Sequence, residues 1–136
     1  MISNEDLAAS FHHEILEKQR YDLIDEQISV DFVAHAPIPD EWAHGREGVR
    51  KWFTAMNEGL SNIGDRHDDT IVSGDKVVIR WTGTGTHTGE MFGVPATGKD
   101  VSVMGIDVFR IQDGKIAEIW QSYDQMGMMR QIGAME

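Results

Sequence analysis

The apolar residues of the first sixty positions recur mainly with the spacing of α-helices. This spacing predicts three helices, over residues 3–20, 21–28 and 48–60. Ser3 is placed to cap the first of them, because its side-chain oxygen can accept a backbone N–H of the first turn. Residues 30–37 alternate less clearly and stop at prolines, so we expect a short strand or extended segment there.

From residue 68 onward the pattern changes to the two-residue alternation of β-strands. The segments predicted to be strands are residues 70–73, 76–87, 101–111 and 115–124. Asp113-Gly114 lies between the last two strands and is the strongest hairpin signal in the sequence, typical of a type I′ turn. Helices followed by an antiparallel sheet indicate an α+β fold.

The hairpin turn predicts which side chains share a face of the sheet. With a two-residue loop, Asp107 lies opposite Trp120, and Asp124 lies opposite Val103. A single β-bulge would reverse the faces of one strand. The other face is expected to carry an apolar set, more apolar than a solvated sheet face normally is, so something should cover it. This set comprises Ile106, Val108, Ile119 and Tyr123.

Two aspartates of this hairpin are the candidate acid–base residues. A carboxylate among Val, Phe and Trp side chains loses hydration, which raises its pKa and lets it exchange a proton near neutral pH. We therefore assign this role to Asp107 and Asp124. The alternative for Asp107 is a pairing with an arginine or contact with water, as for most carboxylates. Trp81 and His87 share one face of the preceding strand, and with His35 they are candidates for a pocket.

The remaining histidines give weaker signals. His12 and His13 are neighbours on a helix and point in different directions, so we interpret them as structural or solvated. His44 and His67 fall in segments predicted to be polar loops and are expected to be solvated. No H-x-x-x-H or H-E-x-x-H spacing occurs and the chain has no cysteine, so the sequence predicts no metal site.

Residues 93–99 fit the G-x-x-x-x-G-K part of a phosphate-binding loop. That loop works only when it opens a helix and continues with Ser or Thr. Here Asp100 occupies the hydroxyl position, and residues 101–111 are predicted to be a strand. We therefore expect no nucleotide site.

Composition narrows the possible partners. The net charge of −11 repels nucleic acids and anionic membranes, and no 18-residue apolar run is present. At 136 residues with 40% hydrophobic content, the chain is expected to be one folded domain spanning residues 1–136. The acidic start lacks the apolar core of a secretion signal, and the absence of cysteine agrees with a reducing compartment, so we expect the cytoplasm.

Short strings distributed along the chain also form a recognisable combination. They are DFVAHAP, residues 45–60, 85–90 and 95–99, Gly105-Ile106-Asp107, Asp113-Gly114-Lys115-Ile116, Glu118 with Trp120, Asp124, and Gln131-Ile132-Gly133. Together they resemble the SnoaL-like polyketide cyclase family, within the nuclear transport factor 2-like superfamily. Nearly the whole chain takes part in this resemblance.

The resemblance implies a cone-like, curved antiparallel sheet packed against three helices around a pocket, in a homodimer. It implies an intramolecular aldol reaction without cofactor or metal, with an acidic residue as acid and base. By strand position, Asp107 resembles the catalytic carboxylate of the related ketosteroid isomerases. The acid of the cyclases falls on Asp124 or on the position of Gln121, and Met91 and Phe92 are expected near the cavity.

Two functions remain open at this point. The first is a small cofactor-independent enzyme in which Asp107 and Asp124 move protons on an apolar carbonyl compound. The residues expected to bind that substrate are His35, Trp81, His87, Met91, Phe92, Trp120 and Gln121. The second is a noncatalytic ligand-binding module, since one fold serves many functions.

Overall fold

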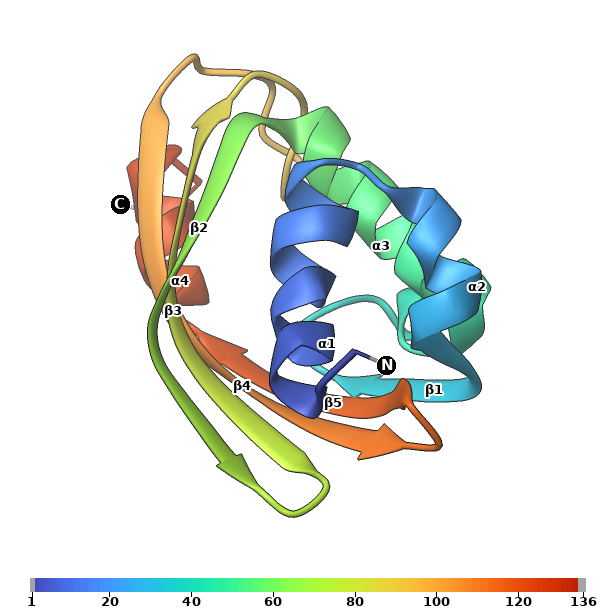
Figure 1. Cartoon of the computed structure of the whole chain (residues 1–136). Coiled ribbons are helices and arrows are strands. Elements are labelled where there is room, and N and C mark those ends of the chain that lie inside the picture. The colour runs from blue at the N-terminus through green and yellow to red at the C-terminus, as the bar shows by residue number, and fades with distance from the viewer. Residues whose placement is uncertain (1, 135–136) are drawn as a thin grey trace.

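A curved, open five-stranded sheet wraps around the N-terminal helices in the computed structural model, which describes residues 2–134 (Figure 1). The strands are β1 (Ile28–His35), β2 (Leu60–Ser73), β3 (Lys76–His87), β4 (Asp100–Gln112) and β5 (Lys115–Tyr123). Their order in the sheet is β1-β5-β4-β3-β2. The predicted α+β class is confirmed. The sheet is antiparallel except at one edge, where β1 runs parallel to β5.

The helices lie mainly in the concave side of this sheet (Figure 1). They are α1 (Asn4–Ser10), η1 (Phe11–Glu17), η2 (Tyr21–Leu23), α2 (Ile24–Gln27), η3 (Asp40–Trp42), α3 (Gly45–Gly59) and α4 (Gln125–Gln131). Ser3 caps α1 as predicted, because its side chain accepts a hydrogen bond from the backbone nitrogen of Asp6 at 3.1 Å. The helix α4 was not predicted from the sequence.

The first helix changes from α to π geometry at Phe11. The wider π turn brings neighbouring side chains onto one buried face, with Phe11 and His12 followed by Ile15 and Leu16. This geometry explains why His12 is buried. Of the two possibilities stated from the sequence, structural or solvated, the solvated one is wrong for His12.

An aromatic cluster fixes the position of this helix against the sheet. The ring of Phe11 lies 4.8 Å from Phe53, 5.5 Å from Phe109 and 5.9 Å from Trp52, in edge-to-face contacts. Phe11, Phe53 and Phe109 are at most 2% exposed. Removing such a buried ring costs about 3–5 kcal/mol, so this packing holds the next residue, His12, firmly in place.

The predicted type I′ hairpin is confirmed. Asp113 has φ +52° and Gly114 has φ +73°, the two left-handed residues that this turn requires. On β3, Trp81 and His87 share one face, as predicted, and this is the inner face, where both are buried.

A β-bulge at Ala117 corrects the predicted register of β5. Ile111 pairs with Ile116, but the next residue of β4, Arg110, pairs with Glu118, so Ala117 has no partner. Asp107 therefore lies opposite Gln121, and Val108 lies opposite Trp120. The predicted facing pair of Asp107 and Trp120 is wrong, because the extra residue reverses the faces of β5 beyond it.

The same bulge decides which residues point inward. Ile119 is fully buried, and Tyr123 lines the inner side of the sheet rather than its outer face, where we had placed both. Trp120 is 37% exposed on the outer face, together with Ile106, which is 48% exposed.

The strand β2 starts ten residues earlier than predicted. Residues 61–69 are rich in polar side chains and were expected to be a loop, but they pair with β3 along the sheet edge. Asp65 and His67 therefore project from a strand. By contrast, the loop of residues 88–99 leads directly into β4, in agreement with the predicted strand after Lys99. No helix among residues 2–134 has the length and apolar character needed to cross a bilayer.

Candidate active site

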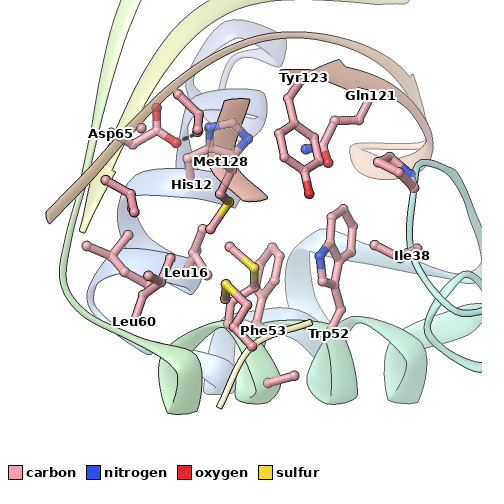
Figure 2. Close-up of a pocket in the computed structure, with 18 of the residues that line it drawn as sticks. His12, Leu16, Ile38, Trp52, Phe53, Leu60, Asp65, Gln121, Tyr123 and Met128 are labelled. Atoms are coloured by element: carbon pink, nitrogen blue, oxygen red, sulfur yellow. Dashed lines mark ion pairs between the residues drawn. The ribbon is translucent and has the colours of Figure 1, made fainter. Parts of the chain in front are cut away.

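A cavity of about 420 Å³ lies between the inner face of the sheet and the helices (Figure 2). Most of its wall is apolar and comes from segments far apart in the sequence. Prominent apolar wall residues are Leu16, Trp42, Trp52, Phe53, Met56 and Met128. A mainly apolar cavity of this volume suits a small organic ligand, whose orientation a few polar groups can then fix.

The main polar feature of the wall is a buried cluster centred on His12. The Nδ1 of His12 donates to Asp65 Oδ2 at 2.5 Å, and its Nε2 donates to Asp107 Oδ2 at 2.7 Å. The indole nitrogen of Trp81 donates to the other oxygen of Asp107 at 3.0 Å. The side chains of these four residues are almost completely buried, and they come from η1, β2, β4 and β3.

The two carboxylates keep His12 protonated. Burial alone would lower the pKa of His12, but the charge and hydrogen bond of Asp107, followed by those of Asp65, raise it to about 10. At neutral pH the side chain is therefore an imidazolium. Both of its N–H groups are used by carboxylates, so it has none left for a ligand.

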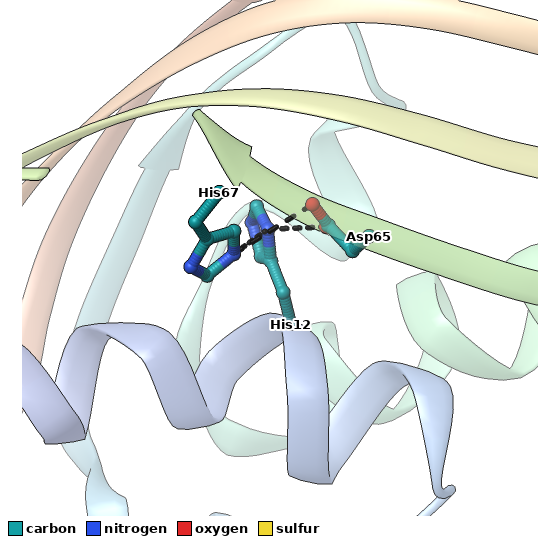
Figure 3. A group of neighbouring side chains, drawn as sticks. All are labelled: His12, Asp65 and His67. Carbon is teal, nitrogen blue, oxygen red and sulfur yellow. Dashed lines mark hydrogen bonds and ion pairs between the residues drawn. The ribbon is translucent and has the colours of Figure 1, made fainter. Parts of the chain in front are cut away.

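His67 lies beside this cluster and is neutral. Figure 3 shows His12 between His67 and Asp65. Burial, followed by the charge interactions with His12 and His13, lowers the pKa of His67 to about 4, despite the opposing effect of Asp65. The ring of His13 stacks on His67 at 4.0 Å, and His13 Nε2 donates to the backbone oxygen of Asp65 at 2.8 Å.

The ligand atoms of His12, Asp65 and His67 lie within 4.8 Å of one another, which is close enough to surround a cation. Coordination by His12 would require its Nδ1 proton to leave, because a histidine binds metals through an unprotonated nitrogen. The two carboxylates hold that proton with a pKa of about 10. The chemistry of this donor set therefore favours a proton rather than a metal at Nδ1.

The second carboxylate oxygen of Asp65, Oδ1, lies 3.6 Å from His67 Nε2, beyond hydrogen-bond distance. The Oδ2 of Asp65 is held by His12, whereas its Oδ1 is buried and has no hydrogen-bond partner among the described residues. The side chain is 6% exposed, and Asp65 belongs to the cavity wall. The backbone nitrogen of Asp65 donates to Glu17 at 2.9 Å, which fixes the position of the residue. A buried acceptor without a donor is uncommon in proteins and can bind or deprotonate a ligand group.

Comparison with known proteins agrees with this architecture. The model of the SnoaL-like polyketide cyclase family matches residues 6–132. The chain belongs to this family. Similar solved structures include TsrD from Streptomyces laurentii, with 27% identity, a TM-score of 0.86 and coverage of 99% of this chain and 100% of that chain. IdmH from Streptomyces antibioticus, a proposed polyketide cyclase, has 27% identity and a TM-score of 0.81, with 97% of this chain and 99% of that chain covered.

A search of curated protein sequences finds no significant match. The fold is that of the nuclear transport factor 2-like superfamily, as the resemblance implied. Membership of the SnoaL-like family and the names of its neighbours support a polyketide cyclase-type role.

In this member of the SnoaL-like family, part of the site predicted from the sequence surrounds the cavity. Trp81, Met91, Phe92 and Gln121 all belong to the wall. Asp107 is on the inner face of the sheet but is 0% exposed and lies behind His12 and Trp81. It contacts the groups that line the cavity rather than the cavity itself.

The remaining predicted residues lie elsewhere. Asp124 is exposed and caps α4 by accepting a hydrogen bond from the backbone of Gly127 at 2.9 Å, so it does not form a pair with Asp107. His35 and Trp120 stack on each other on the outer face at 5.3 Å. Trp120 was expected to bind the substrate together with Trp81, but the bulge places it on the opposite face of the sheet.

His87 is fully buried outside the cavity wall. Its Nδ1 accepts a hydrogen bond from the backbone nitrogen of Thr97 at 3.3 Å and contacts the Thr97 hydroxyl at 2.9 Å. It thus ties the loop of residues 88–99 to β3, and the structure does not place it where it could orient a ligand in the cavity.

Sequence reasoning missed His12, Asp65, His67 and Tyr123. Two adjacent apolar residues at Ile116-Ala117, both buried, were the available signal for the bulge that turns Tyr123 inward. For His12, Asp65 and His67 the signal was weak, since their proximity depends on contacts between a helix and a distant strand.

Proposed function

We propose that the chain is a cofactor-independent enzyme of the polyketide-cyclase type, which closes a ring in an apolar carbonyl compound by an intramolecular aldol reaction. One observation carries this proposal. Asp65 belongs to the wall of an apolar cavity, and one of its carboxylate oxygens has no hydrogen-bond partner among the described residues while the protonated His12 holds the other. This arrangement differs from the sequence-based assignment of Asp107 and Asp124.

The proposed reaction uses Asp65 twice. Asp65 Oδ1 removes a proton from the carbon next to a carbonyl group, and the C–H electron pair forms an enolate. The enolate carbon attacks a second carbonyl carbon of the same molecule, forming the C–C bond of the ring. The resulting alkoxide then takes the proton back from Asp65, so no proton is gained or lost overall.

The charge of the buried cluster supports this role. Before reaction, Asp65 and Asp107 each carry a negative charge, His12 is positive and His67 is neutral, so the cluster has a net charge of −1. Uptake of the substrate proton by Asp65 makes the cluster neutral. The negative charge moves to the enolate in the same cavity, so the proton transfer leaves the total charge of the site unchanged.

His12 and Asp107 then act as positioning residues. The imidazolium holds the carboxylate of Asp65 in one orientation, and Asp107 fixes the ring of His12 from the other side. Trp81 in turn holds Asp107 through its indole N–H. Such supporting hydrogen bonds keep a reacting group within the narrow geometry that catalysis requires.

The alternative is a noncatalytic ligand-binding module on the same fold. Such a module would need the apolar cavity but would have no use for a base. Substitution of the base therefore separates the two functions.

A matched pair of variants tests the proposal. Asp65→Asn preserves size and can still accept the hydrogen bond from His12, but it removes the base. Asp124→Asn makes the same chemical change at an exposed position where Asn also caps a helix. The assay is the exchange of α-hydrogen for deuterium in β-tetralone, a neutral bicyclic ketone, followed by proton NMR in heavy water.

We expect Asp65→Asn to reduce catalysed exchange by about a hundredfold or more, the usual scale for a general base. Asp124→Asn should retain the activity of the wild type. If the wild type does not accelerate exchange over buffer, or Asp65→Asn is as active as the wild type, the catalytic proposal fails and the binding module replaces it.

A further inference from the structure

The cluster around Asp65 leaves a second requirement of the proposed reaction unmet. An enolate develops negative charge on its oxygen, and catalysis needs a hydrogen-bond donor at that position. Both N–H groups of His12 are engaged by carboxylates, and the indole N–H of Trp81 is engaged by Asp107. The oxygen must therefore be bound by other groups of the cavity wall.

Two polar side chains of β5 are placed for this task. Gln121 and Tyr123 both belong to the cavity wall. Figure 2 shows them pointing into the cavity above Trp52, on the side away from His12 and Asp65. They face inward because of the bulge at Ala117, since the regular register would have turned Trp120 and Ser122 inward instead.

Both side chains can donate a hydrogen bond at neutral pH. Burial raises the pKa of Tyr123 above its ordinary value of 10.0, so the phenol keeps its proton. The amide of Gln121 always carries two N–H donors. Together they can bind one carbonyl or enolate oxygen from one side of the cavity.

The charges of the wall also indicate what the cavity selects. Among residues 2–134, the acidic residues of the wall are Asp65 and Glu90, and its cation is His12, which is neutralised by its carboxylate partners. Within the part of the chain that the structure describes, no Lys or Arg lines the cavity. A phosphate group would find no ion pair there and would be repelled by the net charge of −11.

We propose that Gln121 and Tyr123 form the oxygen-binding subsite of this cavity and that the subsite takes the carbonyl or enol oxygen of a neutral ligand. The inference rests on the proposed function, because it places the carbonyl group opposite the base. With the oxygen held by β5, the adjacent α-carbon is directed toward Asp65. Gln121 and Tyr123 stabilise the enolate, whereas Asp65 moves the proton.

Binding of two probes to the full chain tests the subsite without an activity assay. β-Naphthol is a neutral and stable mimic of an enol, and β-naphthyl phosphate carries the same rings with a charged group. Isothermal titration calorimetry should show that wild type binds β-naphthol at least about tenfold more tightly than the phosphate, since transfer of an unpaired charge into an apolar site is costly.

Three variants of β5 complete the experiment. Tyr123→Phe and Gln121→Leu remove one donor each with little change in volume, and each should weaken β-naphthol binding about tenfold, as expected for one hydrogen bond. Ser122 lies between these two residues and is exposed. Its variant Ser122→Ala is therefore the matched control and should bind β-naphthol as tightly as the wild type does.

A measurement on the wild type avoids any dependence on the folding of the variants. Addition of β-naphthol should shift the side-chain amide signals of Gln121 in a nitrogen–proton NMR spectrum. Absence of β-naphthol binding, unchanged binding by both donor variants, equal binding of the phosphate, or unshifted Gln121 amide signals would each overturn the subsite.

The failure of the subsite can be distinguished from the failure of Asp65 as the base. If Asp65→Asn loses exchange activity while Tyr123→Phe and Gln121→Leu bind β-naphthol normally, only the subsite is wrong. If the two β5 variants lose β-naphthol binding while Asp65→Asn remains fully active, the subsite stands as a ligand site and the assigned base is wrong.

Discussion

Deprotonation of His12 at high pH should destabilise the folded chain. The pKa of His12 is about 10 in the fold, against the ordinary histidine value of 6.5 that applies to the unfolded chain. Below pH 6.5 both states bind this proton, and the ion pairs with Asp107 and Asp65 contribute their full stabilisation. As the pH rises from 6.5 to about 10, the unfolded state has lost the proton and only the fold retains it, so stability falls.

The size of this effect follows from the shift. A change from 6.5 to about 10, at 1.36 kcal/mol per pKa unit, corresponds to about 5 kcal/mol. Domains of this size are stable by roughly 5–15 kcal/mol, so the loss is a large part of the total. Urea unfolding measured from pH 6 to pH 10.5 should show the free energy of unfolding declining across this range.

Lysines and tyrosines also titrate near the upper end of this range, so a residue-specific measurement is the control. The ring carbon and proton signals of His12 in an NMR titration should remain those of an imidazolium at pH 8. A His12 that titrates between pH 6 and 7 would refute the reasoning, because the two carboxylates would then not be holding its proton.

Three further predictions follow from the packing and charges. The pKa of His67 is lowered to about 4, so between pH 6.5 and 4 the unfolded chain binds a proton that the fold excludes. The free energy of unfolding should therefore fall by up to about 3 kcal/mol as the pH drops from 6.5 to 4. Urea unfolding should show that His67→Gln loses this part of the acid sensitivity. In Gly105→Ala the added Cβ would lie 2.2 Å from a ring carbon of Trp81, so thermal and urea unfolding should show a loss of about 1–3 kcal/mol. Exposed Ile106 and Trp120 on the outer face of the sheet should be covered by a second copy of the chain, and light scattering should give a dimer mass at micromolar concentration; a monomer mass would contradict this expectation.

The sequence predicted correctly those features that depend on neighbouring residues alone, such as the hairpin turn and the alternation of side chains along β4. Asp113-Gly114 specifies its turn through the φ values that the two residues adopt, and the inner position of Asp107 follows from strand alternation. The faces of β5 could not be predicted in the same way, because one extra residue at Ala117 shifts every later side chain to the opposite face. A local feature of one residue thus decided whether Trp120 or Gln121 would line the cavity.

The cluster at the centre of the site was harder to predict because its members are distant in the chain. Asp65 lies on a strand whose polar residues are typical of a loop, and it meets His12 only when β2 curves past the first helix. The burial of His12 depends in addition on the π geometry of that helix. Neither feature leaves a strong pattern in the sequence, although the apolar residues around His12 do predict a helix with a buried face.

The position of an enol mimic relative to Asp65 tests the central claim most directly. A crystal structure of the wild-type protein with β-naphthol should show the rings inside the cavity. The ring carbon next to the hydroxyl-bearing carbon represents the α-carbon, and we predict it within about 3.5 Å of Asp65 Oδ1, the distance of a reactive arrangement. A ligand bound outside the cavity, or one that directs this carbon away from Asp65, would contradict the assignment of Asp65 as the base.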